Sequence, residues 1–368
     1  MFLSFFLSPI THHFIIMTPD SSIYRFASNP FFNRAGRLRS GWRLGVFVLL
    51  YVILLTVLLG GMFVLLFPSS VGSNEAVASA LESRVGFVAQ AFALFTAAAL
   101  IGWGCGRLLE GLPWRALGWA LHHGWWRDLA IGSLVGAGSL VVGALITMAF
   151  GGFTFNFKAA EFLPAALNTL LVSGIIFVLA AAAEEVLFRG YPLQTVLRSW
   201  PAWLAIIPSS IMFAVVHLGN PNVARGFTFV NTTLAGVWLA VAYLRTRSLW
   251  FPLGVHWSWN WTMGALLGLP VSGITQIAPD PLLRATDNGP AWLTGGSYGI
   301  EGGAACTVAL LLSTIFIWRT RLVSATEDLK KYTDEENPAQ VAEPLTLFEE
   351  PTHTIQPPAS DGSLKADN

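Results

Sequence analysis

Long apolar runs that lack charge constrain the fold of this chain more than any other feature. About eight of them are long enough, or nearly so, to cross about 30 Å of hydrocarbon as helices that rise about 1.5 Å per residue. They are Val46–Phe67, Val85–Trp103, Ala130–Phe150, Pro164–Leu187, Trp203–Leu218, Phe227–Leu244, Leu249–Leu269 and Ala304–Trp318. Two runs are short, at Trp203–Leu218 and Ala304–Trp318, so one of them could be re-entrant. The pattern predicts an all-α, polytopic membrane bundle of about eight transmembrane helices, because open sheets leave backbone groups unpaired in lipid.

The composition agrees with a membrane protein. The chain is 54% hydrophobic and 11% charged, about half the charged fraction of an average soluble protein. Its formal net charge is zero, so it lacks the basic field that attracts nucleic acid, and nucleic-acid binding is disfavoured. Cys105 and Cys306 lie in separate apolar runs and match no metal-ligand spacing.

Arginine and lysine residues beside the runs predict the orientation in the membrane. If the helices alternate, most of these residues fall on the side of the N-terminus, which is cytoplasmic by the positive-inside rule. The other side receives only Arg84, Lys158, Arg225 and Arg284. We therefore expect a multi-pass protein of the cell membrane with both termini in the cytoplasm.

Two adjacent carboxylates lie at the end of one apolar run, as Glu184-Glu185, and Arg189 follows. Each carboxylate at membrane depth costs about 2.5–3.5 kcal/mol, so intramembrane carboxylates are usually functional. Residues four apart share a helix face, so Glu185 and Arg189 can pair. Glu184 faces another neighbour about 100° away and stays available as a general base.

Farther along, His217 follows Phe213 by four residues, and Asn260 follows His256 by four. These imidazole and amide groups could bind a metal, activate water or donate hydrogen bonds to an oxyanion. Asn220, Asn222 and Asn231 also follow the first histidine, and we expect them to cap helix ends or line a cavity.

Taken in order, Glu184-Glu185-x-x-x-Arg189, Phe213-x-x-x-His217 and His256-x-x-x-Asn260 resemble the three motifs of a known family. It is the CAAX protease and bacteriocin-processing (CPBP) family of intramembrane metalloproteases, which includes the type 2 CAAX prenyl endopeptidase. The resemblance covers roughly Phe162 to Leu269, and every motif position is filled.

The resemblance implies an intramembrane catalytic cavity and an endopeptidase that hydrolyses a peptide bond with an activated water. By position, it assigns water activation to Glu184 with His217, and oxyanion stabilisation to His256 with Asn260. Glu185 and Arg189 would organise the site or contact the substrate. The substrate would be a peptide or a membrane protein surrounded by lipid.

The resemblance also implies a divalent metal, most simply zinc. Glu184, His217 and His256 could supply three ligands and leave one position open. However, the sequence lacks the His-Glu-x-x-His pair of soluble zinc proteases, and a glutamate-based hydrolysis without metal would use the same residues. Both alternatives stay open at this stage.

One geometric conflict arises from the predicted spans. If Trp203–Leu218 crosses the membrane fully, His217 lies about 20 Å in depth from Glu184. We expect instead that the helix bearing Glu184 is longer or tilted, or that Tyr191–Pro201 is re-entrant, so that the two side chains meet.

These predictions divide the chain into segments of different character. They are residues 1–43 as a cytoplasmic N-terminal segment, 44–161 as N-terminal transmembrane helices, 162–269 as the catalytic core, 270–303 as an extracytoplasmic loop, 304–321 as the last transmembrane helix and 322–368 as a disordered cytoplasmic tail. Trp292 and Tyr298 could pack the loop back on the helix ends.

Two other functions compete with a protease. A non-proteolytic scaffold or bacteriocin-immunity protein could keep the fold, although the full polar set argues against it. A proton-coupled transporter could also use intramembrane glutamate and histidine, but it predicts polar residues in two matching halves. Here they cluster in the C-terminal half.

Overall fold

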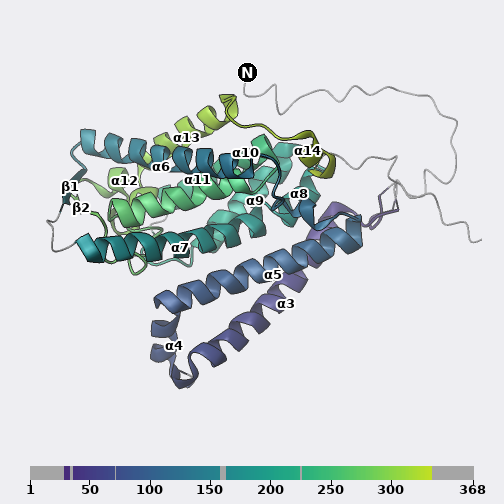
Figure 1. Ribbon diagram of the computed structural model, residues 1–368, viewed down its shortest axis with the longest axis horizontal. Helices are drawn as coiled ribbons and strands as arrows, with labels where there is room; N and C mark the ends of the chain where they lie inside the picture. The colour runs from purple at the N-terminus through teal and green to yellow at the C-terminus, as the bar shows by residue number, and fades with distance from the viewer. Residues whose placement is uncertain (1–28, 34–35, 71, 158–162, 224–225, 334–368) are drawn as a thin grey trace, which may run out of the picture. The chain divides into compact units, whose positions relative to one another are not determined.

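The computed structural model describes residues 29–33, 36–70, 72–157, 163–223 and 226–333, and they are mostly helical (Figure 1). Most of the predicted N-terminal segment and the tail from residue 334 lie outside the described residues. So do Lys158 and Arg225, which contribute to the predicted orientation.

Within the described residues, five helical segments are long and apolar enough to cross a membrane, by length and composition. They are α3 (Ser40–Leu66), α5 (Arg84–Glu110), α6 (Trp125–Ala149), α7 (Leu163–Phe188) continued by α8 (Tyr191–Leu197), and α10 (Phe227–Thr246). Two apolar helices are shorter, α9 (Ala202–His217) and α13 (Ala304–Arg319). The chain therefore fits a helical membrane protein, while the predicted count of about eight spanning helices is not confirmed.

The apolar run Leu249–Leu269, which carries the third motif, forms α11 (Trp250–Trp261) and continues into a π-helical turn, η4 (Thr262–Leu266). Helix α11 packs against α6, α7 and α10. Its contact with α6 is close: a Cβ atom added at Gly136 would lie 2.0 Å from the carbonyl oxygen of Val255, and one added at Gly254 would lie 2.3 Å from that of Leu129. Glycine at both positions lets the backbones approach, and this fixes the depth and rotation of α11.

Helices α3 and α5 pack on each other and are joined by α4 (Asn74–Leu81), and α5 also packs on α7 (Figure 1). A buried ion cluster connects them to the region of α8. Glu110 lies 3.5 Å from Arg43 on α3 and 2.6 Å from Arg198 just after α8. Half of the apolar side chains of α3 are exposed, and only Phe47 and Tyr51 among them are buried, which suits contact with lipid.

The structure also contains a two-stranded antiparallel sheet, which the all-α prediction omits. Strand β1 (Phe153–Phe157) pairs with β2 (Leu283–Asp287), in a register that places Phe155 opposite Ala285. The rest of the predicted loop carries the short helices α12 (Ala291–Thr294), η5 (Gly296–Tyr298) and η6 (Ile300–Gly302). Tyr298 packs back as predicted and is 1% exposed, whereas Trp292 is 60% exposed and does not.

The first part of the predicted disordered tail is helical, as α14 (Glu327–Thr333). Leu329 is buried, and Arg198 donates a hydrogen bond of 3.4 Å to the carbonyl of Tyr332. The prediction of disorder, which rests on the polar composition of the tail, is therefore wrong for residues 327–333.

Candidate active site

The predicted ion pair of the first motif is present on α7. Arg189 Nη1 donates to Glu185 Oε1 at 3.2 Å, and both side chains are buried. The second guanidinium nitrogen, Nη2, donates to the carbonyl of Gly236 at 3.2 Å. The guanidinium carbon also lies 4.6 Å from the ring centroid of Phe213, within cation–π range. The arginine therefore ties α7 to both α9 and α10.

Glu185 has a second partner, which the sequence analysis missed. His256 Nδ1 lies 2.8 Å from Glu185 Oε1, so one carboxylate oxygen accepts from both Arg189 and His256. A carboxylate oxygen accepts hydrogen bonds, so Nδ1 is the protonated nitrogen of this imidazole. The other nitrogen, Nε2, faces Glu184, with 3.7 Å between it and Oε2. Glu185 thus orients the imidazole of the third motif.

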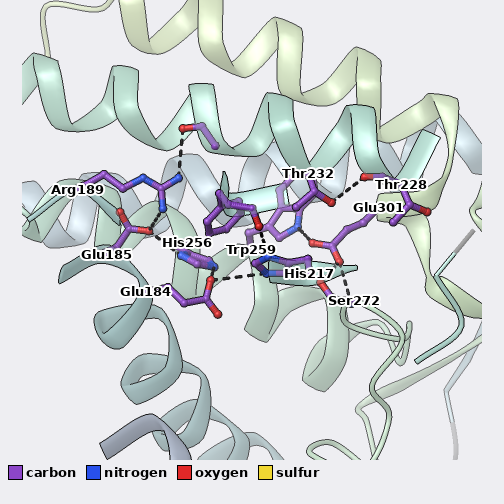
Figure 2. A network of polar contacts seen from close by, with 12 residues as sticks. Glu184, Glu185, Arg189, His217, Thr228, Thr232, His256, Trp259, Ser272 and Glu301 are labelled. Carbon is purple, nitrogen blue, oxygen red and sulfur yellow. Dashed lines mark hydrogen bonds and ion pairs between the residues drawn. The ribbon is translucent and has the colours of Figure 1, made fainter. Parts of the chain in front are cut away.

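His217, the last residue of α9, is oriented in a similar way by its own helix. Its Nδ1 lies 2.6 Å from the carbonyl oxygen of Phe213, which can only accept. Its Nε2 therefore points away from the helix backbone and lies 3.8 Å from Glu184 Oε2 (Figure 2). Phe213 contributes its ring as well, with 4.5 Å between the Phe213 and His217 ring centroids.

Glu184 and His217 meet as expected, with 3.8 Å between Glu184 Oε2 and His217 Nε2. Helix α7 ends at Phe188, and α8 begins at Tyr191 with Pro192 in its first turn. A proline there needs no hydrogen-bond partner for its nitrogen, so a new helix starts readily at this point. Helix α9 then starts after Pro201.

A cavity of about 530 Å³ contains the polar ends of these side chains. Its lining includes Glu184, His217, His256 and Asn260, together with apolar residues from α3, α5, α7 and α10. Glu184 Oε2 is buried and makes no hydrogen bond within the described residues, although the side chain as a whole is 30% exposed. The motif residues that the resemblance assigns to water activation and to oxyanion stabilisation therefore line the same cavity.

Glu301, in the loop between α11 and α13, also lines this cavity and was not predicted. Its Oε1 accepts from Trp259 Nε1 at 3.1 Å. Its Oε2 accepts from the backbone nitrogen and the hydroxyl of Ser272, at 2.8 and 2.7 Å. Burial, with the nearby charge of Glu301, raises the pKa of Tyr298 to about 12, so this phenol stays neutral near pH 7.

Asn231 fixes the backbone beside Glu301 instead of capping a helix. Its Nδ2 donates to the carbonyls of Glu301 and Gly303, at 2.8 and 2.9 Å, and its Oδ1 accepts from the hydroxyl of Thr307 at 2.6 Å. Asn220 lines the cavity, and Asn222 donates to the carbonyl of Gly273 at 3.4 Å. The expectation of helix capping is therefore wrong for Asn231, whose bonds join α10 to the start of α13.

The predicted metal ligands match zinc in chemistry but do not form a metal site as placed. Both imidazoles present Nε2 toward Glu184, and each has Nδ1 held by an acceptor, as metal-binding histidines do. Yet among the described residues no group of three or more His, Cys, Asp or Glu side chains is arranged to hold a metal ion. The zinc site stays a prediction.

Comparison with known proteins identifies the segment that carries this site. Residues 165–262 match the family model described as type II CAAX prenyl endopeptidase Rce1-like. The match runs from α7 to the start of η4 and includes every predicted site residue, while Glu301 lies outside it. Searches of the curated proteins and of the solved structures found no match.

Proposed function

We propose that the chain is an intramembrane endopeptidase, because residues 165–262 match the family model described as type II CAAX prenyl endopeptidase Rce1-like. In this proposal Glu184 is the general base that activates the hydrolytic water. The observation that carries the proposal is the position of Glu184 Oε2, which faces Nε2 of His217 and Nε2 of His256 at 3.8 and 3.7 Å inside the cavity.

The water-activating step uses Glu184 and His217. Polar atoms at these separations are commonly bridged by a water molecule. In the neutral imidazole with its proton on Nδ1, Nε2 of His217 is an acceptor, as is the carboxylate of Glu184. The water donates to both, its proton passes to Glu184, and its oxygen forms a bond to the carbonyl carbon of the substrate.

The negative charge that develops on the substrate oxygen needs donors. Asn260 Nδ2 is one, since the Asn260 side chain lines the cavity and makes no hydrogen bond within the described residues. His256 is the other when Nε2 carries a proton, because its Nδ1 proton is already committed to Glu185. The carbon–nitrogen bond then breaks, and Glu184 returns the proton to the leaving amine. Glu185 and Arg189 act by holding His256 in place.

No step of this mechanism passes through a metal. If zinc binds, Glu184, His217 and His256 are the residues that would hold it, and its chemistry would be polarisation of the substrate carbonyl and of a bound water. The same three side chains would then have to converge more closely than they do here.

The proposed peptidase takes its substrate from the membrane. The substrate is a peptide or a membrane protein that approaches from lipid, since apolar side chains of α3, α5 and α7 make up much of the cavity lining. Both termini lie in the cytoplasm, as the distribution of arginine favours.

The test is cleavage of a fluorogenic peptide library by the full chain purified in detergent. Glu184→Gln and His217→Ala should each lower kcat by about 10²–10⁴-fold, whereas Glu82→Gln and His123→Ala, at exposed positions, should cleave like the wild type. Zinc content is measured on the same samples, with and without a chelator.

Each outcome has one meaning. Wild-type activity in Glu184→Gln would refute the mechanism. Activity that is lost with a chelator and restored by zinc would replace the metal-free form by the zinc form. Cleavage of no peptide by a folded wild-type protein would favour the scaffold or immunity function instead.

A further inference from the structure

A second carboxylate, that of Glu301, lies in the same cavity as Glu184, and the motifs leave it unassigned. Figure 2 shows the two carboxylates on either side of His217 and Trp259. Trp259 is a neighbour of Asn260 on α11 and donates to Glu301 at 3.1 Å. The carboxylate is therefore attached to the helix that carries the third motif.

Within the part of the chain that the structure describes, the charge of Glu301 has no counter-ion. Its three donors, Trp259 Nε1 and the nitrogen and hydroxyl of Ser272, are all neutral groups. Among the described residues, no Lys, Arg or His nitrogen forms an ion pair with it. The described residues of the cavity lining also include no lysine or arginine. The donors orient the carboxylate but leave its negative charge available to a ligand.

The backbone around Glu301 is also held in place. Asn231 donates hydrogen bonds to the carbonyls of Glu301 and Gly303, and the adjoining glycine, Gly302, is buried beside Gly295. A charge that is held in place before binding loses little freedom when a partner arrives, which favours specific recognition.

We propose that Glu301 binds the lysine or arginine side chain of a peptide substrate, so that the cavity selects peptides with a basic residue at a fixed distance from the scissile bond. This inference rests on the proposed peptidase function. A basic side chain that enters a partly apolar cavity loses hydration, and a carboxylate already in place compensates for that loss. An α-ammonium group has the same charge, and the test separates it from a side chain.

The experiment measures kcat and KM for matched peptides with the full chain in detergent. Peptides selected from the library carry one lysine, or the neutral norleucine in its place, and each is made with a free and with an acetylated N-terminus. The proteins are the wild type, Glu301→Gln and Asp280→Asn, a control in the same loop that does not line the cavity.

The wild type should cleave the lysine peptide with a kcat/KM roughly 10- to 100-fold above that of the norleucine peptide, mainly through KM. Glu301→Gln should lose this preference, so that the two peptides are cleaved with equal kcat/KM, and Asp280→Asn should keep it. Acetylation should not matter if the side chain is bound. A preference that follows the free N-terminus would overturn the assignment to a side chain.

Two further results overturn the proposal. One is equal cleavage of both peptides by the wild type, which needs no variant to fold. The other is a preference that Glu301→Gln keeps, because a group other than the Glu301 carboxylate would then bind the basic side chain. Failure of the peptidase function is recognised separately, since Glu184→Gln would then leave all cleavage unchanged.

Discussion

Glutamine substitutions at Glu184 and Glu185 should have opposite consequences, although the two residues are adjacent. Glu185 is fully buried and accepts from Arg189 and His256. Glu184 is partly exposed and makes no hydrogen bond through its buried oxygen. Glu185→Gln should therefore destabilise the fold, whereas Glu184→Gln should abolish cleavage and leave the fold intact.

The magnitudes follow from these contacts. Removing one partner from a buried ion pair costs about 3–5 kcal/mol, and each hydrogen bond to a charged group contributes about 1.5–3 kcal/mol. Glutamine keeps one acceptor oxygen, so we expect Glu185→Gln to lower the free energy of unfolding by about 3 kcal/mol, the lower end of that range. Glu184→Gln should change it by less than about 1 kcal/mol.

Unfolding in mixed micelles can be followed by tryptophan fluorescence, since the chain has 15 tryptophans. Glu82→Gln serves as the matched exposed control. Peptide cleavage is measured on the same samples and divided by the folded fraction. Equal losses of stability in the two variants would refute the reasoning, because Glu184 would then be a structural partner of the histidines.

The remaining predictions concern helix packing, the buried ion cluster and the third motif. Gly136→Ala should lower stability by about 1–3 kcal/mol, because its Cβ would lie 2.0 Å from the Val255 carbonyl oxygen. Gly138→Ala, with no atom within 4 Å, should be neutral or stabilise by up to about 1 kcal/mol; equal thermal unfolding of the two would contradict the close α6–α11 contact. Glu110→Gln should cost about 3–5 kcal/mol without changing kcat per folded molecule, because Glu110 does not line the cavity; a lower kcat in the folded fraction would contradict this. Asn260→Ala should lower kcat about 10²–10³-fold at an unchanged unfolding midpoint, and a shifted midpoint with normal kcat would argue against an oxyanion role.

Helical spacing and the burial cost of charge suffice to predict the local parts of the site. The pair of Glu185 and Arg189 follows from their four-residue spacing, and the separate orientation of Glu184 follows from the helical angle. The contact of His256 with Glu185 joins residues 71 positions apart. This contact depends on the rotation of α11 relative to α7, and the sequence of either helix alone does not predict that rotation.

Glu301 shows a different limit. It lies among glycines in a segment whose composition is typical of a loop, and nothing nearby marks it as part of a cavity. Glu301 is a lone carboxylate in a segment that packs back through Tyr298. Only its contacts with Trp259 and Ser272 show that it belongs to the cavity. The small sheet was missed for a similar reason, since β1 and β2 are short and separated by more than a hundred residues.

The bonds of Asn231 have a consequence for the biogenesis of the protein. One amide joins α10 to Glu301, Gly303 and Thr307, so the acidic end of the cavity assembles only after the segment that begins α13 has been synthesised and inserted. A nascent chain that has been synthesised only as far as the end of α11 already contains every motif residue, but it does not yet contain Glu301. The substrate selection proposed for Glu301 is therefore acquired only after the motif residues have been synthesised.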